Sequence, residues 1–211
     1  DYSQSFIDTF NEEQTYQTIY FGGKVNFNDG FVDGANVKLQ HFPDSYNTDE
    51  LLFKMSPKLV LPIASENINT LFSLEYLGGK FNQGFTDENQ IKHSFLNLGE
   101  SPNFEVLRNK LTVNLGVKLY YSFDLDNKNN QFLAYPNVTA SYKISEESFI
   151  GYVGVTGDLM QNSYHNFVAE NPYVSPTLNV EITDQQYNAF IGFKGKNTNV
   201  NYNFKGFYKS E

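Results

Sequence analysis

The chain contains no cysteine, few basic residues and no long apolar run, and each scarcity narrows its class. Without cysteine it can form neither a disulfide framework nor a thiolate site. No segment approaches the roughly 18 consecutive apolar residues that a membrane-spanning helix needs. The 15 Lys and Arg residues stand against 24 Asp and Glu residues, so the formal net charge is −9. This balance argues against nucleic acid as a partner.

What the chain does contain favours β-structure. Its 211 residues suffice for one domain of ordinary size, and 17% of them are aromatic. Aromatic side chains are typical of strands and of the girdles at the membrane interfaces of β-barrels. The mean hydropathy is low, at −0.46. A low mean is compatible with a membrane barrel, because only every second residue of a barrel strand faces lipid.

One stretch, Leu111 to Asp124, carries the clearest pattern of the chain. Apolar residues alternate there with polar ones, which predicts a β-strand with one apolar and one polar face. Strands of soluble proteins usually run about 5–6 residues, whereas a tilted membrane-spanning strand needs roughly 9–11. The alternation here persists for about 13 residues, which favours a transmembrane β-barrel. The apolar positions are Leu111, Val113, Leu115, Val117, Leu119, Tyr121 and Phe123.

Connection lengths support the same fold. Ten or eleven candidate strands follow one another, and the first is residues 2–10. Tight turns fall near residues 29, 67, 109, 147 and 198, and longer connections fall near 12, 46, 85, 127 and 173. Outer-membrane barrels alternate short and long connections in this way, and a Greek-key sandwich does not. We therefore predict an all-β, antiparallel up-and-down transmembrane β-barrel, with residues 1–211 as one segment of a larger barrel. We expect both ends of this segment to be truncated.

Three prolines interrupt the alternating segments. Pro57, Pro102 and Pro136 share a side with the apolar residues of their strands. Proline cannot donate a ladder hydrogen bond and is normally confined to edges or bulges. We therefore predict bulges or bends at these positions.

The polar faces supply candidates for a passage. Seven polar residues are predicted to face the lumen, and the alternative is the wet outer face of a soluble sheet. They are Asn114, Lys118, Lys143, Lys194, Asn201, Asn203 and Lys205. In the longest irregular stretch, residues 162–184, the external-loop candidates for contact with a ligand or partner are Glu170, Asn171 and Tyr173. A structural cap over the rim is the alternative for that loop.

The chain contains no complete metal-binding, catalytic or phosphate-binding motif. The Asp124-x-Asp126-x-Lys128 pattern lacks the glycine and glutamate of a calcium loop. His41, His93 and His165 form no metal-ligand spacing, and His93 and Ser94 should point to opposite faces of one strand. Gly22-Gly23-Lys24 and Gly78-Gly79-Lys80 lack the rest of a phosphate loop, and their glycines are interpreted as relieving crowding or allowing curvature. No catalytic residue, metal or cofactor is predicted.

Several segments resemble a known family. Residues 166–174, Thr183 to Tyr187 and Gly192 to Gly195 are similar to the C-terminal half of Bacteroidota-type outer-membrane barrels, the TonB-dependent receptor-like proteins. Residues 96–121 are similar in style, and the resemblance spans about residues 51–208. It implies an outer-membrane location and uptake of a ligand. The matching residues include no plug domain, TonB box or terminal strand, so the resemblance implies the barrel and not energised transport.

Three hypotheses for function follow. The first is an outer-membrane barrel that acts as a channel or receptor for uptake, or as a structural wall of an envelope complex. Its partners would be outer-membrane lipid and either other envelope proteins or a small ligand. The second is a soluble or surface-exposed β-sandwich that binds glycan or protein. The third is a barrel enzyme, which the sequence does not support because it offers no convergent Ser/His/acid motif.

Overall fold

The computed structural model describes residues 14–63, 66–82, 90–145, 149–175 and 177–211. Ten strands and one helix of seven residues follow one another in this part of the chain. None of its helices is long and apolar enough to cross a membrane. The elements are β1 (Ile19–Asn26), β2 (Val32–Pro43), β3 (Asp49–Ile63), β4 (Glu66–Phe81), β5 (Ile91–Arg108), β6 (Leu111–Asp124), β7 (Gln131–Ser145), β8 (Phe149–Gln161), α1 (Tyr164–Glu170), β9 (Ile182–Asn197) and β10 (Val200–Ser210).

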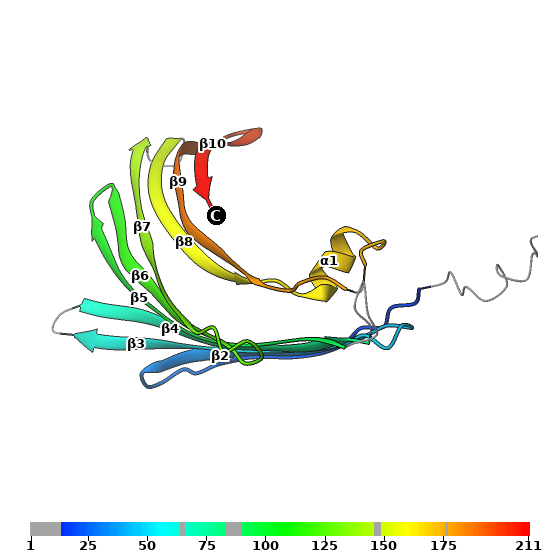
Figure 1. Ribbon diagram of the computed structural model, residues 1–211. Helices are drawn as coiled ribbons and strands as arrows, with labels where there is room; N and C mark the ends of the chain where they lie inside the picture. The colour runs from blue at the N-terminus through cyan, green and yellow to red at the C-terminus, as the bar shows by residue number, and fades with distance from the viewer. Residues whose placement is uncertain (1–13, 64–65, 83–89, 146–148, 176) are drawn as a thin grey trace, which may run out of the picture.

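Each strand pairs antiparallel with the next one along the chain, so the sheet order is β1 to β10. The all-β, antiparallel up-and-down architecture is therefore confirmed. Figure 1 shows that the sheet curves strongly, with α1 on its concave side. Strands β1 and β10 form its two edges, and the described sheet is not closed. The sandwich alternative is wrong, because all ten described strands belong to this one sheet.

The central strand has the bounds that the sequence pattern predicts, since β6 covers Leu111–Asp124. The predicted first strand, residues 2–10, lies outside the described residues. Residues 162–184 were expected to be irregular, which is wrong for two parts of that stretch. Residues 164–170 form α1, and β9 already begins at Ile182.

The two faces of the sheet follow from its register. The Lys118 ammonium and the Asp158 carboxylate are 2.8 Å apart, although β7 lies between their strands. Side chains from strands two apart converge on the concave face of a curved sheet, so Lys118 faces the concave side. Alternation and register then place Leu115 and Val117 of β6 on the convex side, together with Val138 of β7. The convex face is therefore predominantly apolar and the concave face predominantly polar.

The connections alternate in length between the two rims. One rim has the links at residues 27–31, 64–65, 109–110, 146–148 and 198–199. The other rim has residues 44–48, 82–90, 125–130 and 162–181, and we call it the long-loop rim. The predicted connection near residue 12 lies outside the described residues, and the alternation is confirmed for the others with one exception. The connection near residue 46 has only five residues, and the Asp44 carboxylate holds it by accepting the N–H groups of Tyr46 and Thr48.

The prolines do not make bulges. Pairing between β3 and β4 stops at Met55 and resumes at Lys58 in unchanged register, so the ladder is interrupted at Pro57 without an extra residue. The β5–β6 pairing has the same gap at Pro102. Pairing of β7 with β8 begins only after Pro136. The missing proline N–H explains the gaps at Pro57 and Pro102, because it removes one ladder bond and inserts no residue. It does not explain the β7–β8 case, where residues 131–136 all lack a partner on β8 and the register shift at 156/158 lies beside the break. The recorded register shifts lie elsewhere, at 32/34, 143/145 and 156/158.

A small core lies on the concave face below α1. Side chains from β2, β3 and β4 pack there against the helix and the segment after it, and all of them are buried. They are Phe42, Leu52, Leu77 and Phe81 of the sheet, with Tyr164, Val168 and Val180 above them. The Phe81 and Tyr164 rings meet edge to face, with their centroids 5.1 Å apart. Residues 162–181 are thus anchored inside the curve of the sheet.

Candidate functional site

The seven residues predicted to line a passage all lie on the concave face. Asn114 and Lys118 of β6 share it with Lys143 of β7 by register. Lys194 of β9 follows through Ile150 of β8, which faces both Lys143 and Lys194. The β10 residues Asn201, Asn203 and Lys205 pair with Lys196, Lys194 and Gly192 of β9 and complete the set. The structure therefore distributes these residues over one continuous surface and does not gather them into a compact site.

The concave face carries most of the positive charge of the chain. Ten of the fifteen basic residues occupy concave-facing strand positions, whereas the chain as a whole has a net charge of −9. The ten are Lys24, Lys38, Lys54, Lys58, Lys118, Lys143, Lys194, Lys196, Lys205 and Lys209. Most acidic residues instead lie in connections, at strand ends or near the termini. The alternation in the sequence predicted four of these lysines as lumen-facing: Lys118, Lys143, Lys194 and Lys205. It did not reveal that basic residues gather on one face of the sheet and acidic residues in the connections.

Three of the concave lysines have a carboxylate partner. Their Nζ atoms lie 2.6–2.8 Å from a carboxylate oxygen, in the pairs Lys54–Glu75, Lys58–Asp33 and Lys118–Asp158. The Asp158 carboxylate also accepts the Tyr120 hydroxyl at 2.9 Å, so β8 is linked twice to β6 across β7. The other seven concave lysines have no carboxylate within 4.0 Å in the described part of the chain. Three of these seven ammonium groups lie over an aromatic ring instead, in the pairs Lys38–Tyr20, Lys205–Phe190 and Lys209–Phe207.

A buried carboxylate ties α1 to the sheet. Glu50 of β3 is 2% exposed and accepts the backbone N–H of Tyr164 at 2.6 Å and that of His165 at 3.1 Å. The first N–H groups of a helix have no partner within it, and a negative charge there is favourable. His93 of β5 lies 3.4 Å from the same carboxylate, which is an electrostatic contact because neither ring nitrogen makes a hydrogen bond. Sequence patterns could not reveal this arrangement, since Glu50 and Tyr164 are 114 positions apart.

Other contacts hold the same segment at the long-loop rim. The Ser163 hydroxyl caps α1 by accepting the Asn166 N–H at 3.1 Å. The Tyr164 hydroxyl donates to the Asp44 carboxylate at 3.1 Å, and burial together with that carboxylate raises the pKa of the hydroxyl. The Tyr16 hydroxyl donates to the carbonyl of Pro172 at 2.8 Å. Hydrogen bonds therefore join residues 162–181 to the β2–β3 connection and to the segment before β1, in addition to the packing on the sheet.

The three external-loop candidates differ in their roles. Asn171 follows α1, and its side-chain oxygen accepts the Tyr173 N–H at 3.1 Å, so it shapes the turn. Glu170 is exposed at the end of the helix. The Tyr173 side chain is 94% exposed. Glu170 and Tyr173 are accessible to a partner, whereas the Asn171 side chain stabilises the turn after α1.

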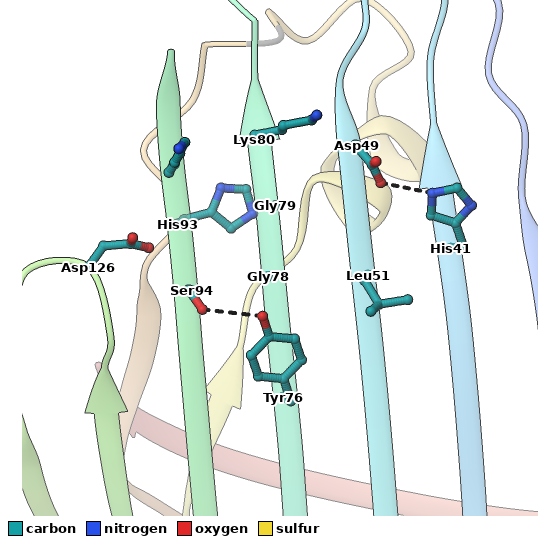
Figure 2. A pocket seen from close by; sticks show the side chains of 11 residues that line it. His41, Asp49, Leu51, Tyr76, Gly78, Gly79, Lys80, His93, Ser94 and Asp126 are labelled. Carbon is teal, nitrogen blue, oxygen red and sulfur yellow. Dashed lines mark hydrogen bonds and ion pairs between the residues drawn. The ribbon is translucent and has the colours of Figure 1, made fainter.

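A hollow of about 440 Å³ opens on the convex face at the long-loop rim, over β2 to β5 (Figure 2). The His41 ring and the Asp49 carboxylate pair at one side of it at 2.8 Å, and the Ser94 hydroxyl lies 3.5 Å from that of Tyr76. Lys80, Lys92 and Asp126 complete its charged border. The charges of Lys80 and Lys92 are balanced by those of Asp49 and Asp126, so the hollow favours neither an anion nor a cation.

The rejected motifs have structural roles. His93 is buried on the concave face and Ser94 lies on the convex face, as the alternation predicted. A Cβ added at Gly79 would overlap the His93 ring, and one at Gly78 would overlap the Tyr76 hydroxyl, so both glycines relieve crowding. The same holds at Gly22, where a Cβ would overlap the Tyr20 hydroxyl, but it is wrong for Gly23, which has no atom within 4 Å of that position. The Asp124 carboxylate accepts the N–H groups of residues 126 and 127 and so holds its own loop. No group of three His, Asp or Glu side chains suited to a metal occurs among the described residues.

Comparison with protein families, with curated proteins and with solved structures found no match to this chain.

Proposed function

We propose that this chain is a wall section of an outer-membrane β-barrel, with the convex face toward hydrocarbon and the concave face toward a polar passage. The observation that carries the proposal is the apolar convex face, which no second layer covers in the described part of the chain. Leu115 is 48% exposed there, Ile191 68% and Phe204 60%. In water such a continuous apolar face would drive association, whereas a bilayer solvates it.

The strand lengths suit this environment. Strands β3 to β9 each have 13 to 18 residues. At roughly 3.3 Å per residue, the 14 residues of β6 extend about 46 Å, or about 35 Å across a membrane when tilted by about 40°. The apolar band of a membrane barrel is about 25 Å tall. Each long strand therefore exceeds the hydrocarbon thickness and leaves both of its ends in polar surroundings.

The polar concave face supports a passage for uptake, as a channel or a receptor. Carboxamide and ammonium groups such as those of Asn114 and Lys143 favour water over hydrocarbon. No catalytic role is proposed for these groups. The partners on this proposal are outer-membrane lipid and a small ligand or neighbouring envelope proteins.

A structural wall of an envelope complex is the second candidate. The observation that favours it is the inward position of residues 162–181, which cover the concave face over β2 to β4 at the long-loop rim. The two candidates differ in ion conduction across a planar bilayer that contains the protein. A passage gives discrete conductance steps, and a wall gives none.

The absence of cysteine allows a direct test of the faces. Single cysteines replace Leu115 and Phe204 on the convex face, and Asn114 and Asn203 on the concave face, and each carries a polarity-sensitive fluorophore. In vesicles of brominated lipid we expect strong quenching at the convex pair and weak quenching at the concave pair. Equal quenching at all four positions, or a protein that stays monomeric in water without detergent, contradicts the barrel.

A further inference from the structure

We infer that the concave face over β7 to β10 binds multivalent anions that carry a flat apolar part. This inference deepens the proposed function, because it names the class of solute that the passage takes. It concerns five concave lysines, which we call the lysine patch. They are Lys143, Lys194, Lys196, Lys205 and Lys209.

The lysine patch has no compensating carboxylate on its strands. β7, the first nine residues of β8 and residues 187–210 contain no Asp or Glu at all. The nearest acidic residues in sequence are Glu146 and Glu147, which lie outside the described residues, and Glu211. Elsewhere on the concave face Lys54, Lys58 and Lys118 each have a carboxylate partner. The lysine patch therefore contains five of the seven concave lysines that have no carboxylate partner in the described part of the chain.

The spacing of the lysines suits an anion with several charges. Lys194 and Lys196 are two residues apart on one strand, which puts their Cβ atoms about 7 Å apart. Lys194 pairs with Asn203, so Lys205 is its diagonal neighbour at about 7–8 Å. Like charges at this separation repel, and an anion between them removes the repulsion. Two or more oxyanion groups on one solute would satisfy adjacent lysines together.

Aromatic rings lie among these lysines on the polar face. Phe190 and Phe207 are paired across β9 and β10, and Phe207 is 63% exposed. The Lys205 ammonium lies 4.1 Å from the centre of the Phe190 ring, close enough for a cation–π contact. Tyr152 is next to Phe190, with ring centroids 6.1 Å apart. Partly exposed aromatic rings beside ammonium groups that have no carboxylate partner fit a ligand that has both a flat apolar part and negative groups.

Glycines make room for these rings. Gly154 faces Phe190 in the β8–β9 pairing, and Gly192 faces Tyr152. A Cβ at Gly154 would contact the Phe190 ring, and one at Gly192 would meet the end of the Tyr152 ring. The rings therefore cover the backbone of the neighbouring strand. The Tyr152 hydroxyl is fixed as well, because it donates to the Asn203 side-chain oxygen at 2.6 Å.

The test uses pyrenetetrasulfonate as the probe and the full chain in detergent micelles, with binding followed by fluorescence anisotropy. We expect binding that weakens with added salt. The double variant Lys194→Gln/Lys205→Gln should lower the affinity by about tenfold, since two charge contacts are removed. The matched control, Lys110→Gln/Lys128→Gln, changes two lysines in connections at the rims and should keep the affinity within about twofold.

A second variant and a competitor test the apolar part of the ligand. Phe207→Leu should lower the affinity for the probe by about threefold. Inorganic sulfate should displace the probe only at a concentration far above that of the probe. An unchanged affinity in Phe207→Leu overturns the aromatic specificity. Absence of probe binding at low salt, or equal losses in the patch variant and its control, overturns the anion site. This assay needs no bilayer, so its failure is distinct from failure of the lipid-quenching test of the barrel.

Discussion

At the residue scale, neighbouring side chains are fitted to one another across strands. Gly79 lies directly opposite His93 in the β4–β5 pairing, and His93 in turn lies against Glu50 below α1. The glycine is required for space, because any Cβ there would overlap the buried imidazole. Gly23 is the contrasting case, since nothing lies within 4 Å of the position of its Cβ.

We therefore expect Gly79→Ala to destabilise the folded protein by about 1–3 kcal/mol, because the ring or the strand must move. Gly23→Ala is the matched control and should change the stability by less than about 0.5 kcal/mol. Urea unfolding followed by loss of heat-modifiable gel migration measures both. Equal effects of the two substitutions on stability would show that crowding between residue 79 and His93 does not destabilise the fold.

At the element scale, α1 depends on the sheet. A helix of seven residues is too short to be stable alone, since isolated helices below about 12–15 residues are marginal in water. Its first turn relies on the Glu50 carboxylate and on the Ser163 cap, and its buried side packs on Phe42 and Phe81. The helix is therefore stable only through its contacts with the sheet and with its capping residue.

Glu50→Gln should open α1 locally at a cost of about 2 kcal/mol, because the amide loses the charge and places a donor near helix N–H groups. Amide hydrogen exchange in residues 164–170 should then be about 30-fold faster while the strands remain protected. Glu105→Gln, at an exposed concave position of β5, is the control and should leave these amides unchanged. Faster exchange in every strand would mean that Glu50 supports the whole sheet.

At the scale of the whole molecule, the proposal depends on which solvent each face meets. A charged residue on a lipid-facing position costs about 2–4 kcal/mol at the bilayer midplane, whereas a lumen-facing position tolerates charge. Leu115 and Asn114 are adjacent in β6 and face opposite sides, so they form a matched pair.

Leu115→Arg should thus destabilise the protein in lipid vesicles by about 2–4 kcal/mol, and Asn114→Arg by less than about 1 kcal/mol. Urea titration of the vesicle-inserted protein, followed by fluorescence, gives both values. A larger loss at Asn114 than at Leu115 would reverse the faces and remove the basis for a lipid-facing convex side.

The strands and their two faces follow from the residue pattern alone. The polypeptide pleat turns successive side chains to opposite sides, so a period of two predicted β6 and the common face of Asn114 and Lys118 without any knowledge of partners. Turn residues and segment spacing likewise predicted the order of neighbours, because short connections join adjacent antiparallel strands.

Which side of the sheet is concave, and what fills it, depends on long-range contacts. The Glu50 contact with α1 and the Lys118–Asp158 pair join residues 114 and 40 positions apart, and no local pattern encodes such distances. The same holds for the lysine patch, since it forms only when register aligns β7, β9 and β10. Local chemistry sets how each strand is built, and long-range pairing sets what those strands bring together.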